Sequence, residues 1–167
     1  MRRLFGFTAA FAVAALLVGT TPAIAAGELT GKMSAFGYLL GAAWNCSTSV
    51  PAMGDMPAHT DRGTATFEVA PGTTVHNHVS TPNYSGDFYF GYTDKMGMYW
   101  QVDSDNMGGH AFLTSSDGIT YNGTSSMGPL SMQDTVTYAK LAPNKVTVHE
   151  VLTGSAPTAT FDSVCTR

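Results

Sequence analysis

Short runs of alternating apolar and polar residues follow one another along the chain after Trp44. Alternation with a period of two places successive side chains on opposite faces of a β-strand, and turn residues separate the runs about every eight to twelve residues. Helical periodicity is absent after Trp44, whereas Leu29 to Leu40 can form one short helix or 3₁₀ turn. The pattern therefore predicts an all-β domain, a sandwich or a barrel.

About ten strands are expected, joined by short connections that favour an antiparallel meander. Met53–Asp61 is expected as a loop, and Ser116-Asp117-Gly118 as a tight hairpin turn, because Asp-Gly tolerates the positive φ that such turns need. The expected strands are Trp44–Val50, Thr64–Ala70, Thr74–Val79, Asp87–Thr93, Met96–Val102, Gly109–Thr114, Ile119–Thr124, Leu130–Ala139, Lys145–Leu152 and Thr158–Cys165.

The N-terminus has the pattern of a secretory signal peptide. Arg2 and Arg3 precede an apolar run from Leu4 to Val18, and Ala23-Ile24-Ala25 is a small-x-small cleavage site. Residues 1–25 are therefore expected to be removed, which leaves residues 26–167 as a single domain that is secreted or periplasmic in a bacterium. We expect no stable membrane insertion, since no second apolar run follows.

Two cysteines, Cys46 and Cys165, lie in the first and last expected strands. In an oxidising compartment such a pair usually forms a disulfide. A sheet that curls into a barrel places its first and last strands side by side, so the pair predicts a barrel closed by this bond.

The charge of the mature chain excludes some partners. Without Arg2 and Arg3, six Lys/Arg stand against twelve Asp/Glu, a net charge near −6. Nucleic acids and anionic membranes need basic patches, so neither is expected as a partner. The sequence does not specify an oligomeric state.

Several expected strand faces combine aromatic and apolar residues with a few acids. Two carboxyl groups share a strand face with apolar residues. Asp134 alternates with Met132, Val136 and Tyr138 on one strand, and Glu150 alternates with Val148 and Leu152 on the next. Turned inward, these faces would line a cavity whose few polar groups orient a ligand. Alternatively the acids lie near a barrel rim or bond to a hydroxyl. The candidate ligand-binding residues are Phe90, Tyr92, Met98, Trp100, Tyr121, Met132, Asp134, Tyr138 and Glu150.

His76 and His78 leave the same face of an expected strand and could share a metal. With Pro71-Gly72 ahead of them they resemble the first half of a cupin metal motif, although no Glu follows at the expected short spacing. The alternative is two exposed histidines. No Gly-x-Ser-x-Gly elbow is present and both cysteines are assigned to a disulfide, so we identify no catalytic residue.

The segment Tyr38 to Cys46 resembles the opening of lipocalin-like, or calycin-like, barrels, in which a short helix precedes a Gly–Trp start to the first strand. Turns and aromatic strand segments along the chain resemble the DUF1579-like families of secreted bacterial proteins. These segments are Phe90-Gly91-Tyr92, Asp103–Gly109, Ser115–Gly118, Tyr121–Ser126 and the terminal Cys165. This resemblance implies a barrel of ten strands that binds a small molecule.

The sequence thus favours a secreted barrel for a small apolar or amphipathic ligand, and no cofactor is required. Two alternatives stay open. One is a cupin-type metal-dependent enzyme built on His76 and His78, and the other is a structural or interaction module with a filled core.

Overall fold

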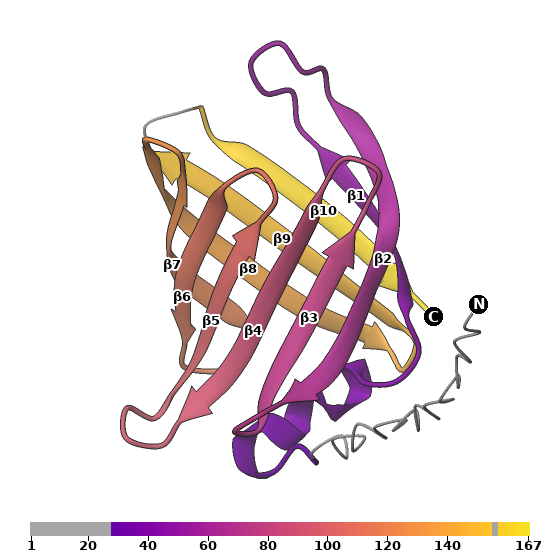
Figure 1. The fold of residues 1–167 in the computed structure, drawn as a ribbon, viewed down its shortest axis with the longest axis vertical. Coiled ribbons are helices and arrows are strands. Elements are labelled where there is room, and N and C mark those ends of the chain that lie inside the picture. Colours follow the sequence, from indigo (N-terminus) through magenta and orange to yellow (C-terminus); the bar gives the residue numbers. More distant parts are fainter. Residues whose placement is uncertain (1–27, 155–156) are drawn as a thin grey trace, which may run out of the picture.

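The computed structural model describes residues 28–154 and 157–167, so the expected signal peptide, residues 1–25, lies outside the described residues. In the described part of the chain, one 3₁₀-helix precedes ten strands (Figure 1). Their bounds are η1 Gly31–Leu39, β1 Trp44–Val50, β2 His59–Ala70, β3 Thr74–Ser80, β4 Ser85–Thr93, β5 Met98–Asp105, β6 Gly109–Ser115, β7 Thr120–Met127, β8 Leu130–Ala142, β9 Lys145–Gly154 and β10 Ala159–Thr166. No helix among them is long and apolar enough to cross a membrane.

The strands form a closed antiparallel barrel in which each strand pairs with its neighbours in sequence and β10 pairs with β1. The predicted all-β meander is therefore confirmed. β2 begins at His59, earlier than expected, and takes in part of the predicted loop. Thr60, Arg62 and Thr64 pair there with polar residues of β1, and a polar segment of this kind gives little apolar alternation to predict a strand.

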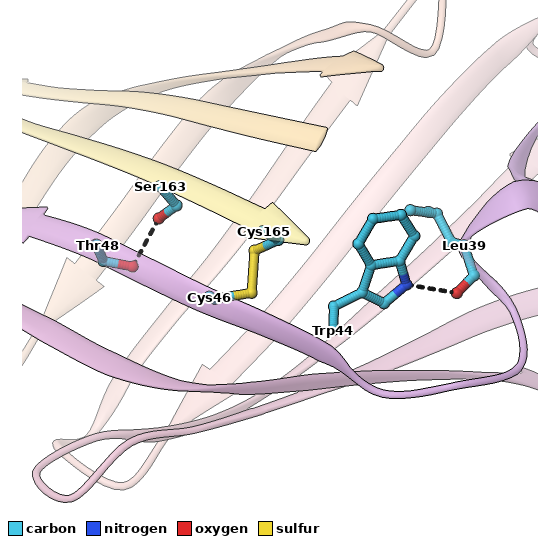
Figure 2. Close-up of a disulfide and its surroundings, with 6 residues drawn as sticks. All are labelled: Leu39, Trp44, Cys46, Thr48, Ser163 and Cys165. Atoms are coloured by element: carbon cyan, nitrogen blue, oxygen red, sulfur yellow. Dashed lines mark hydrogen bonds between the residues drawn. A yellow bond between two sulfur atoms is a disulfide. The ribbon is translucent and has the colours of Figure 1, made fainter. Parts of the chain in front are cut away.

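A disulfide joins Cys46 of β1 to Cys165 of β10, as predicted, and the two residues are direct register partners (Figure 2). Two residues further along the same face, the hydroxyl groups of Thr48 and Ser163 form a hydrogen bond of 2.8 Å. The closure of the barrel is thus covalent at one point and hydrogen-bonded on either side of it.

η1 closes one end of the barrel (Figure 1). A 3₁₀-helix has three residues per turn, so Met33, Phe36 and Leu39 lie in line on one side, and all three are buried. Trp44 is fully buried behind them, and its indole Nε1 donates a hydrogen bond of 2.9 Å to the Leu39 carbonyl (Figure 2). The helix therefore packs into the barrel through a single apolar stripe.

Candidate functional site

Aromatic rings fill the interior next to η1. Phe90 lies edge-on to both Tyr121 and Tyr138, with ring centroids 6.1 and 5.6 Å apart, and these two tyrosines contact each other at 5.7 Å. Phe36 of η1 joins the cluster by stacking on Phe90. Edge-to-face packing of this kind stabilises a core beyond the apolar area it buries.

Seven of the nine candidate ligand-binding residues lie on inward faces of the barrel, because each shares the face of a buried neighbour on its strand. They are Phe90, Tyr92, Tyr121, Met132, Asp134, Tyr138 and Glu150.

The prediction was wrong for Met98 and Trp100, which face outward. The register of β4 and β5 pairs Phe90 with Gln101 and Tyr92 with Tyr99, and directly paired residues share a face. Since Phe90 is buried, its partner Gln101 and the neighbouring Tyr99 point inward. Met98 and Trp100 alternate with them along β5 and therefore point outward. The alternating apolar residues Met96, Met98, Trp100 and Val102 predicted an inward face. Pairing with β4 instead decides which face of β5 is buried.

Trp100 instead lies in a hollow on the outer surface of about 300 Å³, together with Met96, Met98 and Phe112. Its indole covers the backbone of Gly91, where an added Cβ would lie 2.1 Å from the ring. The Trp100 indole can thus lie against the backbone in this hollow only because residue 91 is a glycine.

Three carboxyl groups share the interior away from η1: Asp103 of β5, Asp134 of β8 and Glu150 of β9. Asp134 is 4% exposed, and one carboxylate oxygen accepts a hydrogen bond from Ser125 while Oδ1 has no partner. Burial raises the pKa of Asp134 to about 6, against the Ser125 hydrogen bond. Asp134 thus lies on an inward face, and its hydroxyl partner is Ser125, where a Tyr or Thr hydroxyl was the alternative expectation.

Glu150 is the most strongly perturbed of the three. Burial, and then the charges of Asp134 and Asp103, raise its pKa to about 8. The pKa of Asp103 is also raised by burial, against a hydrogen bond from Gln101. The inner faces therefore hold acids that favour their neutral forms.

A hydrogen-bonded chain connects the aromatic cluster to these acids. The Tyr138 hydroxyl donates to Gln101 Oε1 at 2.9 Å, and Gln101 Nε2 donates to Asp103 Oδ2 at 3.1 Å. Gln101 is 1% exposed. Sequence reasoning missed this residue because a Gln between two apolar outward residues gives no sign of burial.

A groove of about 450 Å³ opens at the helix end of the barrel, between η1, the β6–β7 turn and the end of β8. Four of its ten lining residues are aromatic, and Asp117 and Lys140 are its charged residues. The lining residues are Ala35, Phe36, Tyr38, Tyr99, Asp117, Gly118, Ile119, Tyr138, Ala139 and Lys140.

The two charged residues of this helix-end groove are held differently. Asp117 Oδ1 accepts hydrogen bonds from the backbone N–H groups of Ile119 and Thr120 and from Ser115, which lower its pKa. Lys140 is exposed, and its ammonium lies 4.5 Å from the ring centroid of Tyr38. Asp117 thus fixes the turn, whereas the Lys140 ammonium lies at the surface.

The two histidines proposed as metal ligands lie on the outer face of β3. His76 contacts Glu68 through Nδ1 and Asp87 through Nε2, both at 2.8 Å, and His78 contacts the same Asp87 oxygen at 2.9 Å. Tyr89 stacks on the His76 ring at 4.6 Å. Within residues 28–154 and 157–167, no group of three His, Cys, Asp or Glu side chains is arranged to hold a metal ion. The pair thus forms ion pairs with neighbouring strands.

Comparison with known proteins gave no family model and no curated protein that matches this chain.

Proposed function

We propose that the protein binds a small, largely apolar molecule in the helix-end groove. The observation that carries this proposal is the groove itself, about 450 Å³ in volume and walled by Phe36, Tyr38, Tyr99 and Tyr138. Ligand sites in proteins typically occupy about 300–1,000 Å³ and combine apolar walls with a few polar groups. The lipocalin-like resemblance of the sequence supports the same class of function.

The polar surroundings favour binding over catalysis. A general base or nucleophile needs free hydrogen-bonding capacity facing the ligand. Asp117 Oδ1 accepts hydrogen bonds from turn donors, which lower the pKa of this carboxyl group and make it a weak base, and the Tyr138 hydroxyl donates to Gln101. We therefore propose a binding protein and assign no catalytic residue.

Secretion is part of the proposal. The Cys46–Cys165 disulfide is compatible with an oxidising compartment, and the expected signal peptide would direct the chain there. The ligand is then a molecule met outside the cytoplasm.

A pair of tryptophan variants tests the site. Ala35 lines the groove and is exposed, so Ala35→Trp fills the groove without disturbing the core, while Ser34→Trp adds the same ring at an exposed position on another side of η1 that does not line it. Calorimetric titration with 1-anilinonaphthalene-8-sulfonate should show saturable binding to the wild type and to Ser34→Trp. Binding to Ala35→Trp should weaken roughly tenfold or more. Equal affinity of all three proteins, or no binding at all, would refute the proposal.

A filled structural module is the second candidate. The edge-to-face packing of Phe90, Tyr121 and Tyr138 favours it, because it leaves the aromatic layer of the barrel well packed. Absence of dye binding to the wild type and to both tryptophan variants would favour this function over the first.

A further inference from the structure

Lys140 starts from the inner face of the barrel. It pairs directly with the buried Val146 of β9, and directly paired residues share a face. Arg62 is an odd number of positions from the buried Ala65 of β2 and therefore faces outward. Lys145 directly precedes Val146 and faces outward for the same reason. Lys140 is thus the one lysine or arginine on the inner face of the ten described strands.

The ammonium group of Lys140 is positioned at the edge of the helix-end groove. It lies 4.5 Å from the ring centroid of Tyr38, and both residues line the groove. The negative face of a tyrosine ring attracts a cation placed over it. Because the Lys140 side chain is exposed, its charge lies where the groove meets water.

This ammonium group is available to a ligand. It carries three N–H donors and forms no hydrogen bond or ion pair with another described residue. Tyr38 contributes the face of its ring, which attracts the charge without accepting these hydrogen bonds in the way that a carboxylate does.

The other charge of the groove is already compensated. Asp117 Oδ1 accepts hydrogen bonds from the backbone N–H groups of Ile119 and Thr120 and from the Ser115 hydroxyl. Hydrogen bonds of this kind stabilise an ionised carboxylate. Asp117 and Lys140 form no ion pair with each other although both line the groove, so the two charges act at separate points.

A ligand carboxylate suits the position of Lys140. Its oxygens accept charge-assisted hydrogen bonds from an ammonium group, and these are stronger than hydrogen bonds between neutral groups. At the exposed edge of the groove a carboxylate keeps part of its hydration, so the cost of burying a charge is small. The side chains of Phe36, Tyr99 and Tyr138 are then left to contact an apolar, aromatic part of the same ligand.

We propose that Lys140 is the specificity-determining residue of the helix-end groove, and that it binds the carboxylate of an amphipathic ligand whose aromatic part lies in the groove. This inference rests on the proposed function, since it assigns the class of ligand to the same groove.

Three ligands of nearly equal shape test the inference. 2-Naphthoate, 2-naphthamide and 2-naphthamidine carry a negative, a neutral and a positive group on the same ring system. In calorimetric titrations the wild type should bind them in that order of decreasing affinity, with naphthoate bound roughly three- to tenfold more tightly than the amide. The preference for naphthoate should shrink at high ionic strength, because salt screens an exposed ion pair.

Three variants locate the preference. Lys140→Met keeps the length of the side chain and removes its charge, so it should bind naphthoate no more tightly than the amide and should keep the affinity of the wild type for the amide. Lys140→Arg should retain the preference. Lys145→Met removes an exposed charge from the outer face of β9 and should bind like the wild type. A preference that persists in Lys140→Met, or that is lost equally in Lys145→Met, would overturn the inference.

The outcomes also distinguish this inference from the proposed function. If the wild type binds all three compounds equally and Ala35→Trp weakens their binding, the groove is a ligand site without a charge preference, and the inference alone fails. Tighter binding of the amidine than of naphthoate would assign the preference to Asp117 and would also overturn the inference. If none of the three compounds binds the wild type, both proposals fail.

Discussion

Replacing Glu150 with glutamine should make the protein more stable at neutral pH. The folded state raises the pKa of this carboxyl group from 4.5 to about 8, first through burial and then through the charges of Asp134 and Asp103. A raised acid pKa means that the folded state prefers the protonated form. Glu150 therefore does not lower the unfolding free energy below about pH 4.5, where it is protonated in both states. The unfolding free energy falls progressively as the pH rises from there toward 8.

The size of the effect follows from the same pKa. At about 1.36 kcal/mol per pKa unit, ionising Glu150 in the folded protein costs about 5 kcal/mol above pH 8, of which about 3 kcal/mol is present at pH 7. The side chain retains partial exposure, so screening by water makes these figures upper limits. Glutamine has a similar shape and no charge, and it removes this cost.

Urea unfolding of the wild type and of Glu150→Gln at about pH 4, 7 and 9, with the disulfide intact, measures the difference. The two proteins should have similar stability at the lowest pH and diverge in favour of the variant as the pH rises. Glu28→Gln, at an exposed position, is the matched control and should show no such divergence. A difference independent of pH, or a variant less stable at pH 9, would refute the assignment of Glu150 to a buried acidic interior.

Three further predictions concern the rest of the barrel. Reducing the Cys46–Cys165 bond should lower the unfolding free energy by about 4–5 kcal/mol, because it closes a loop of 119 residues, and thermal melts with and without reductant would test this. Burial lowers the pKa of His76, but its hydrogen bonds to Glu68 and Asp87 outweigh burial and leave the pKa raised. His76→Gln should therefore lower the unfolding free energy by about 1 kcal/mol or less below pH 6, and should have no effect once the pH exceeds the raised pKa. Denaturation at several pH values tests this, and a loss that does not change with pH would contradict a role for the ion pairs. Gly91→Ala should displace the Trp100 indole, cost about 1–3 kcal/mol and change the tryptophan fluorescence, whereas an unchanged spectrum would argue against their contact.

The fold could be predicted from the sequence because strand alternation and turn residues are local signals. The phase of β5 could not, since both of its faces carry apolar residues. Trp100 and Met98 alternate as regularly as the buried Tyr99 and Gln101, and only pairing with β4 decides between the two faces. The burial of Gln101 depends on Tyr138, 37 residues away in sequence.

The candidate site was predicted in part for a similar reason. The inward acids Asp134 and Glu150 were found from their own strands, where apolar neighbours mark the face. The helix-end groove combines Tyr38 of η1, Asp117 of a turn and Lys140 at the end of β8. No local pattern connects these segments, so the groove emerges only when the barrel closes.

The seam between β1 and β10 also bears on how the protein behaves in a crowded solution. With the seam closed, every strand of the described residues has two hydrogen-bonded neighbours, and these ten strands offer no row of unpaired backbone N–H and C=O groups to a strand of another molecule. Separation of these two strands would expose two such rows at once. The bond between Cys46 and Cys165 therefore protects against association between molecules, and its loss should promote aggregation even at temperatures where the barrel remains folded.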